Sequence, residues 1–245
     1  MSEESTSAGH PVEALQALLI GSTDVQVFLA DVSKLAVEMV GGDVSCGITT
    51  RYHGNLLTVG ASDKRAEWLD ETQYRGRGGP CLEAFETGEI VESNILEETR
   101  WPAYTPTARE YGLIASLSLP MSVAGSTLGA LNLYSFTDHE VLRPERRQEC
   151  ERFVAQAAIA VRLAVRQAKD GALLTQLDEA LQSRTIIDQA LGVIMAGQRC
   201  SSTEAFDLLR RQSQNSNRKL REVATDLVTA VSGQPPTPGN QFQVG

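Results

Sequence analysis

The sequence contains few of the side chains that catalysis at neutral pH requires. It has three histidines in 245 residues, and aromatic residues make up 5% of the chain. Because histidine is the side chain that ordinarily titrates near neutrality, general acid–base catalysis has few participants here. The sequence shows no Ser-His-Asp or Cys-His spacing, no Gly-Lys-Thr phosphate loop and no paired-carboxylate motif. We therefore predict that the protein is not an enzyme.

Cysteines and long apolar runs are also scarce. The four cysteines, Cys46, Cys81, Cys150 and Cys200, are far apart and lack the spacing of a metal site. In a reducing compartment they are expected to be free thiols. No apolar run reaches the ~18 residues of a membrane span, and the first residues are acidic, unlike a secretory signal. These features predict no metal, no membrane association and a cytoplasmic location.

Acidic residues are missing from one short segment near the C-terminus. The chain has a formal net charge of -9, yet residues 171–245 hold seven basic and seven acidic residues. Five cations occur between positions 210 and 221 with no acid among them, and such local clustering favours a polyphosphate ligand. Aromatic residues are scarce there too, because Phe206 is the only one in residues 171–233. Base stacking on this part of the chain would therefore depend on arginine guanidinium groups.

The first part of the chain shows the mixed periodicity of an α+β domain. Apolar spacing predicts two helices within residues 12–40, interrupted at Gly21–Asp24, then strands over residues 44–52 and 55–61 joined by a His53–Gly54 turn. Short helices are expected over residues 63–74, 81–87 and 101–111, the last opened by Pro102, with a loop over residues 75–80. Further strands are expected over residues 89–92, 114–123 and 128–135.

From Arg143 onward the pattern is helical. Gly171 interrupts it, either as a hinge or as a domain boundary. Ser201–Glu204 matches a capping box, residues 212–216 are expected to form a polar turn, and Asn217 is expected to cap a last helix. Apolar residues at intervals of three and four resemble a coiled-coil seam: Phe153, Ala157, Ala160, Ala164, Leu174, Leu177, Leu181, Ile187, Leu191 and Ile194.

Several short motifs between residues 180 and 224 resemble an ANTAR domain. They are Ala180-Leu-x-Ser-Arg184, Ile187-x-x-Ala190-x-Gly192-x-x-Met195, Ala205-Phe-x-x-Leu-Arg210 with Ser213, and Asn217-x-Lys-Leu-x-x-Val-Ala224. The resemblance implies a three-helix RNA-binding module that acts in transcription antitermination, as a dimer that grips paired RNA stem-loops. Leu191 departs from the family, which often has Lys there. The affinity that such a Lys provides must then come from elsewhere, or the target differs.

The basic segment is the candidate RNA-binding surface, since Lys and Arg neutralise phosphates. Arg210 and Arg211 are expected to end one helix, and Arg218 and the cations after it to begin the next, so that the turn gathers them on one edge. Cations at a helix start oppose the helix dipole, which favours a role in binding. The alternatives are a solvated face paired with nearby acids and, for Arg184, a coiled-coil flank. The predicted RNA-binding residues are Arg184, Arg210, Arg211, Arg218, Lys219 and Arg221.

The front part resembles a GAF domain, a PAS-like sensor fold, over about residues 12–165. The matching segments are residues 78–92, Ser116-Leu-Ser-Leu-Pro-Met121 and Leu128-Gly-Ala-Leu-Asn-Leu-Tyr134. GAF domains bind cyclic nucleotides, haem, bilins or other small molecules, and some only dimerise, so the cofactor stays unknown. A possible effector loop contains Arg75 and Arg77, which beside glycines suit an anion, and Cys81 as a sensor thiol. The alternatives are a plain surface loop and a small buried cysteine.

Together these features predict a PAS-like antiparallel-sheet GAF domain joined by a long helix to an all-α three-helix ANTAR domain. The expected parts are a tail (1–11), the GAF-like domain (12–165), the ANTAR domain with its coiled-coil helix (166–232) and a second tail (233–245). We expect a cytosolic sensor-regulator, homodimeric through its long helices, that binds RNA hairpins and promotes antitermination. The alternatives are a DNA-binding regulator, and a small-ligand-sensing GAF protein whose helical tail only dimerises.

Overall fold

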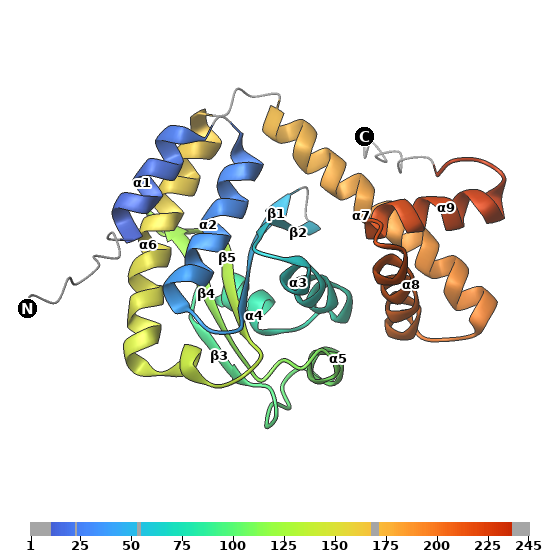
Figure 1. Ribbon diagram of the computed structural model, residues 1–245, viewed down its shortest axis with the longest axis horizontal. Helices are drawn as coiled ribbons and strands as arrows, with labels where there is room; N and C mark the ends of the chain where they lie inside the picture. The colour runs from blue at the N-terminus through green and yellow to red at the C-terminus, as the bar shows by residue number, and fades with distance from the viewer. Residues whose placement is uncertain (1–10, 23, 53–54, 168–171, 237–245) are drawn as a thin grey trace, which may run out of the picture. The chain divides into compact units, whose positions relative to one another are not determined.

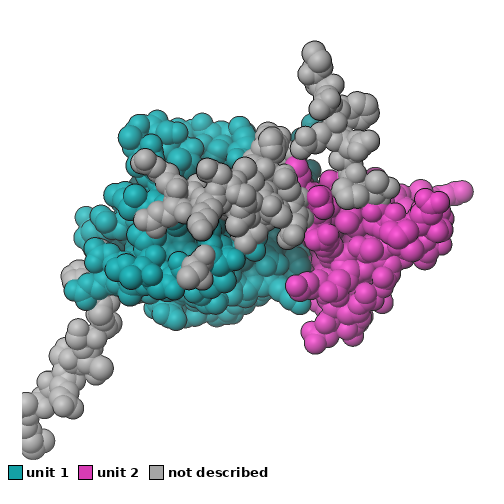
Figure 2. All heavy atoms as spheres, turned by 90° about the horizontal axis from the view of Figure 1, so that it is seen from above, with its two compact units in different colours: residues 1–173 teal, residues 174–245 magenta. Residues whose placement is uncertain are grey.

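The computed structural model describes residues 11–22, 24–52, 55–167 and 172–236. The chain divides into two compact units, which we call the front unit (Met1–Leu173) and the rear unit (Leu174–Gly245) (Figure 2). The expected His53–Gly54 turn, the Gly171 interruption and most of both tails lie outside the described residues.

The front unit contains a five-stranded antiparallel sheet in the order β2-β1-β5-β4-β3. Strand β5 lies at its centre, and its pairing places Asn132 opposite Ser118 and Tyr134 opposite Ser116. Directly paired residues share a face, so these four polar side chains lie on one side of the sheet. The strands are β1 (Val44–Tyr52), β2 (Asn55–Ala61), β3 (Val91–Asn94), β4 (Ala115–Val123) and β5 (Ser126–Ser135).

Helices cover both faces of this sheet (Figure 1). On one face lie α1 (Pro11–Gly21), α2 (Val25–Val40) and α6 (Pro144–Gln167), and on the other α3 (Lys64–Gly76), α4 (Pro80–Thr87) and α5 (Thr105–Glu110). A 3-10 turn, η1 (Glu140–Leu142), precedes α6. The helical break expected near Gly21 is confirmed, because the Asp24 carboxylate accepts the Gln26 and Val27 N–H groups and so starts α2.

Two expectations for the front unit were wrong in detail. Pro102 does not open a helix, because the Trp101 carbonyl accepts from the N–H groups of Tyr104 and Thr105 in a preceding turn, and α5 begins only at Thr105. The first part of the expected coiled-coil seam is also not free to pair with another helix. Its four residues on α6 are buried in the core between the sheet and α1, α2 and α6: Phe153, Ala157, Ala160 and Ala164.

The described part of the rear unit contains three helices, α7 (Ala172–Gln198, from Leu174 onward), α8 (Ser202–Ser216) and α9 (Leu220–Ser232). Ser201 and Glu204 form the expected capping box at the start of α8. The expected polar turn over residues 212–216 was wrong, since α8 continues through it to Ser216 and Asn217 is its C-cap residue. Each helix has one covered face, which contains Ile186, Ala190 and Leu191 of α7, Ala205, Phe206 and Leu209 of α8, and Ala224 and Val228 of α9.

Candidate functional site

The turn between α8 and α9 is held by a small set of hydrogen bonds around Ser213. The Ser213 hydroxyl donates to the Arg218 carbonyl at 2.6 Å, and the Arg218 N–H donates to the Ser213 carbonyl at 3.1 Å. Ser213 is 3% exposed, so its hydroxyl has little access to water. Asn217 has φ 49 in the left-handed region, which Asn tolerates better than most residues. Asn217 therefore caps the end of α8 and not, as expected, the start of α9, where Lys219 is the N-cap residue before Leu220.

Two of the predicted RNA-binding arginines are paired with carboxylates. Arg218 Nη1 donates to Asp226 Oδ2 at 2.5 Å, and its Nε lies 3.6 Å from Glu222 Oε2. These contacts raise the pKa of Arg218, mainly through the Asp226 hydrogen bond. Arg210 Nη2 lies 3.4 Å from Asp207 Oδ1, and its side chain is only 17% exposed. Arg210 therefore contributes little to the surface of the rear unit.

Three other cations of this set are exposed and differently placed in their helices. Arg211 lies within α8, Lys219 is the N-cap residue of α9, and Arg221 lies in the first turn of α9. The side chains of these three residues make no ion pair or hydrogen bond within the described part of the chain. Because α8 runs on to Ser216, the expectation that Arg211 ends its helix was wrong. These three cations are free to meet an anion.

The remaining rear-unit positions differ in burial. Arg184 is partly exposed on α7 and is engaged in an interaction. Leu191, which departs from the ANTAR pattern, is 2% exposed and belongs to the covered face of α7. Burial of a leucine side chain favours folding by about 2 kcal/mol. Leu191 therefore contributes to the core of the rear unit and is not part of its exposed basic surface.

The predicted effector-loop residues do not form a loop. Arg75 lies in the last turn of α3, with its Nε 3.0 Å from Glu71 Oε1, and Arg77 is the exposed residue that ends this helix at φ 50. Cys81 lies in the first turn of α4 and is fully buried. Burial and the nearby Asp70 raise the pKa of the Cys81 thiol far above its ordinary value. A protonated, buried thiol is a poor nucleophile. Cys81 therefore fits the alternative of a small buried residue better than a role as a sensor thiol.

A buried polar network on the α3–α5 face of the sheet was missed by the sequence reading. Its centre is Asp70 of α3, which is fully buried and has no cation beside it among the residues that form the network. Asp70 accepts hydrogen bonds from Thr58 at 2.9 Å, from Asn132 at 3.0 Å and from the Tyr134 hydroxyl. The Gln73 amide donates to Tyr134 at 2.8 Å and its carbonyl accepts the Cys81 N–H at 2.8 Å. Asn132 also donates to the Thr49 hydroxyl of β1 at 3.2 Å, so this network links α3 and α4 to strands β1, β2 and β5.

Burial dominates the protonation of Asp70. It raises the pKa of this carboxyl to about 7, although the hydrogen bonds from Tyr134, Thr58 and Asn132 act in the opposite direction. Gly47 belongs to the same arrangement, because a side chain at that position would collide with the Asp70 carboxylate. The spacing of Asp70, Gln73 and Tyr74 at i, i+3 and i+4 was the available signal. It marks one helix face, but only the sheet shows that this face is buried.

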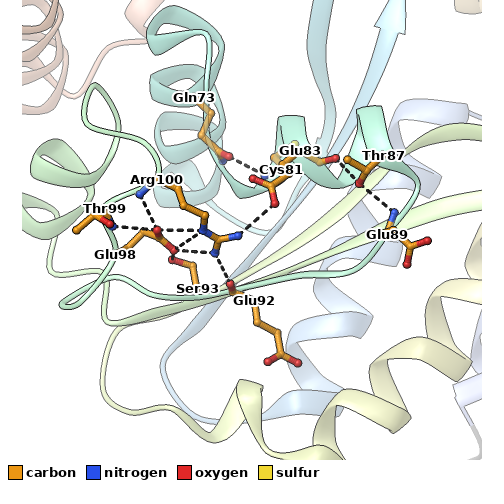
Figure 3. A network of polar contacts seen from close by, with 10 residues as sticks. All are labelled: Gln73, Cys81, Glu83, Thr87, Glu89, Glu92, Ser93, Glu98, Thr99 and Arg100. Carbon is orange, nitrogen blue, oxygen red and sulfur yellow. Dashed lines mark hydrogen bonds and ion pairs between the residues drawn. The ribbon is translucent and has the colours of Figure 1, made fainter.

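A second polar network fixes the segment between β3 and α5 (Figure 3). The Arg100 guanidinium contacts Glu98 at 2.7 Å, Glu83 of α4 at 3.1 Å and the Glu92 carbonyl of β3 at 2.8 Å, and it lies over the Trp101 ring. The Glu98 side chain is 7% exposed. Burial acts to raise the pKa of Glu98, but hydrogen bonds from Arg100 and Ser93 lower it overall to about 2. This arginine therefore joins three segments of the front unit.

The described residues offer little to a metal or a membrane. They contain no group of three His, Cys, Asp or Glu side chains placed to hold a metal ion. Within the same residues, no helix is long and apolar enough to cross a bilayer. A small pocket of about 210 Å³ lies against strands β1, β2, β4 and β5 and helix α6, and its lining is mostly apolar, with Ile48, Met121 and Val161 among its residues.

Comparisons with known proteins identify the two parts of the chain. The profile of the GAF domain matches residues 22–162, and the profile of the ANTAR domain matches residues 175–228. Both domains are regulatory and non-catalytic. No curated protein sequence matches the chain.

Solved GAF domains have a similar fold. The phycocyanobilin-bound GAF domain of a cyanobacterial phytochrome has a TM-score of 0.50 at 10% identity, covering 65% of this chain and 96% of that chain. The GAF domain of A. aeolicus nlh2 in an inactive state has a TM-score of 0.48 at 18% identity, covering 62% and 94%. At such identities the likeness concerns the fold alone. The expected α+β sheet domain followed by a helical domain is confirmed.

Proposed function

Because the chain belongs to the GAF domain family and carries an ANTAR domain after its GAF domain, we propose that it is a sensor-regulator that binds RNA. Its rear unit binds paired RNA stem-loops and promotes transcription antitermination in the cytoplasm, without catalysis. The observation that carries this proposal is the set of three exposed cations, Arg211, Lys219 and Arg221, that have no carboxylate partner in the described part of the chain. Their charge is available for phosphates.

The front unit supplies the control in this proposal. Four buried polar atoms on its α3–α5 side have no hydrogen-bond partner within the described residues: Tyr104 Oη, Ser116 Oγ, Ser118 Oγ and Asn132 Oδ1. Buried polar atoms usually meet a partner, either ordered water or a ligand. We propose that a small polar effector binds on this side, and that the chain pairs with a second copy through its long helices. Two RNA-binding surfaces would then be presented together.

The test is recovery of RNA with the full-length chain from cells, by cross-linking and sequencing. The expected result is enrichment of transcripts with two adjacent stem-loops near a terminator. The control is the triple variant Arg211→Gln, Lys219→Gln and Arg221→Gln, which should lose this enrichment. Competition at fixed salt between an enriched hairpin RNA and duplex DNA then separates the classes. Preference for the duplex would favour the DNA-binding alternative, and absence of both would favour a tail that only dimerises.

A further inference from the structure

We call the junction of α8 and α9 with its five cations, Arg210, Arg211, Arg218, Lys219 and Arg221, the basic turn. Arg218 differs from the other exposed cations of this turn in its charge environment. Two acids of α9 hold it, Asp226 at 2.5 Å and Glu222 at 3.6 Å, whereas Lys219 and Arg221, which follow it in the sequence, have no such partner in the described part of the chain. One guanidinium and two carboxylates carry a local net charge of -1. A phosphate approaching Arg218 would therefore meet a net negative group, which weakens the attraction on which phosphate binding depends.

The way in which Arg218 is held leaves a different interaction open. Hydrogen-bond donors of a guanidinium lie in its plane, so a carboxylate bound at Nη1 contacts the edge and leaves the faces uncovered. The Arg218 side chain is 45% exposed. An arginine that is held at its edge offers a flat, oriented surface on which an RNA base can stack.

The rear unit has no exposed aromatic ring among its described residues on which a base could stack. Its single aromatic residue there, Phe206, is 3% exposed and belongs to the core. Unpaired loop bases are nevertheless the part of a hairpin that carries sequence information, and they are read mainly by stacking and edge hydrogen bonds. A hairpin reader without an exposed aromatic ring must use a guanidinium for this purpose.

We propose that Arg218 reads an unpaired loop base of the RNA hairpin by stacking, with Asp226 and Glu222 as the residues that position its guanidinium plane. Arg211, Lys219 and Arg221 neutralise phosphates of the same hairpin. This inference rests on the proposed RNA-binding function. It divides the basic turn into one residue that determines specificity and three residues that provide salt-dependent affinity.

The test compares two single variants of the full-length chain on a hairpin RNA recovered from cells. Arg218→Lys keeps the charge and the backbone contacts with Ser213 but removes the plane. Lys219→Gln removes a charge that has no partner. We expect Arg218→Lys to weaken binding roughly tenfold with an unchanged salt dependence. We expect Lys219→Gln to make the slope of log affinity against log salt shallower by about one.

The second arm asks whether the loop base and Arg218 are coupled. Each loop base in turn is replaced by an abasic site, and one such RNA should bind Arg218→Lys and the unchanged protein equally, because the stacking partner is already gone. Asp226→Asn should also weaken binding to the intact hairpin and not to that abasic RNA. A general folding defect would lower binding to both RNAs equally.

Three outcomes would overturn the inference while leaving RNA binding intact. The first is that Arg218→Lys binds every hairpin like the unchanged protein. The second is that its loss persists on all abasic RNAs. The third is that Asp226→Asn binds all RNAs more tightly with a steeper salt slope, which would make the acid a competitor of phosphate. If the unchanged protein binds no hairpin RNA, the proposed function itself fails, and this result is distinct from the other three.

Discussion

Several arginines of the front unit are held in place by carboxylates or aromatic rings, whereas most exposed cations of the basic turn in the rear unit have no carboxylate partner within the described part of the chain. Arg65 pairs with Asp43 at 2.7 Å and lies over the Phe136 ring, and Arg147 pairs with both Glu92 and Glu151. Arg211 and Lys219 have no carboxylate within the described part of the chain. Cationic side chains thus join segments in the front unit and stay available to a ligand in the rear unit.

The comparison extends to acids. The front unit contains a carboxyl, Asp70, that is fully buried among neutral hydrogen-bond donors, whereas the acids that pair with Arg218 in the rear unit are exposed. Exposed ion pairs contribute about 0–1 kcal/mol, because water and salt screen them. A buried ionised group has a far larger effect on stability. The front unit should therefore respond to pH in its stability, and the rear unit to salt in its binding.

The largest expected effect is the loss of this pH response in Asp70→Asn. An acid with a raised pKa binds its proton more tightly in the folded protein. Its contribution therefore favours folding below the unfolded pKa of 3.8 and is lost as the pH rises through about 7. The full difference is about 4 kcal/mol. We expect the stability of Asp70→Asn relative to the unchanged protein to rise by this order between pH 4 and pH 8.

Urea unfolding followed by tryptophan fluorescence measures this difference in stability for the front unit. Both tryptophans, Trp68 and Trp101, lie in the front unit, so the signal does not include unfolding of the rear unit. Asn keeps an oxygen that can accept from Asn132 and Tyr134, and its amide can donate to Thr58. A relative stability that stays constant from pH 4 to pH 8 would show that Asp70 does not titrate in this range.

The next effect concerns RNA affinity in the triple variant Arg211→Gln, Lys219→Gln and Arg221→Gln. Losing three phosphate contacts should make the salt slope shallower by about three and weaken binding on the order of 100-fold near 0.15 M salt. The free energy of unfolding should change by less than about 0.5 kcal/mol, because these surface side chains hold no other segment. A titration of one hairpin RNA at several salt concentrations measures the slope.

A matched triple variant in the front unit serves as the control. Arg65→Gln, Arg100→Gln and Arg147→Gln change the net charge by the same amount, but each removes an arginine that is held by carboxylates. We expect this control to lose stability and to keep its RNA affinity and salt slope. If both triple variants lost affinity equally, the overall charge of the chain and not the basic turn would govern binding.

Sequence patterns predicted the elements well where hydrophobic periodicity alone decides them. Strands β1 and β2 have the expected bounds, because they alternate apolar and polar residues between clear turn signals. The end of α8 was missed because polar residues do not by themselves stop a helix. Asn217 can adopt the left-handed conformation that ends it, and the hydroxyl of Ser213 reaches the carbonyl beyond it.

The state of each charged side chain was much harder to predict. All five cations of the segment look alike in the sequence, but Asp226 lies eight positions after Arg218 and reaches it only because α9 begins between them. In the sequence, Asp70 looks like an ordinary polar residue of an exposed helix face. Strand β5, whose Asn132 donates a hydrogen bond to Asp70, is more than 60 positions away. Pairing and burial depend on contacts between distant segments, which local patterns do not contain.

A smaller effect is expected for Arg100→Gln in the front unit. This change leaves the nearly buried Glu98 without its main partner and should lower the free energy of unfolding by about 1–2 kcal/mol. Because the pKa of Glu98 is about 2, the stability from the pair is present above pH 4.5 and is lost as the pH falls through about 2. The variant should lack this part of the acid sensitivity.

Arg143→Gln is the matched control for this prediction. Arg143 pairs with Glu140 at 2.7 Å, but the two side chains are largely exposed. We expect less than about 0.5 kcal/mol from its removal. Equal losses from Arg100→Gln and Arg143→Gln, measured by tryptophan fluorescence in urea, would contradict the role of Arg100 as the residue that joins α4, β3 and the segment before α5.

The smallest effect is expected at the turn of the rear unit, in Ser213→Ala. The variant leaves the Arg218 carbonyl without its buried hydroxyl donor, which should lower local stability by about 1 kcal/mol. Hydrogen exchange of the α8 and α9 amides measures this, since the rear unit has no tryptophan. Ser216→Ala is the control, because Ser216 is exposed and its hydroxyl bonds back to the Gln212 and Ser213 carbonyls of its own helix, so Ala should be neutral or slightly stabilising. RNA affinity should fall only a few-fold in Ser213→Ala with the salt slope unchanged, because every cation remains and only its placement is relaxed. A shallower slope would mean that the turn determines how many cations reach phosphates, and that the rear unit, like the front unit, depends on internal polar contacts for its function.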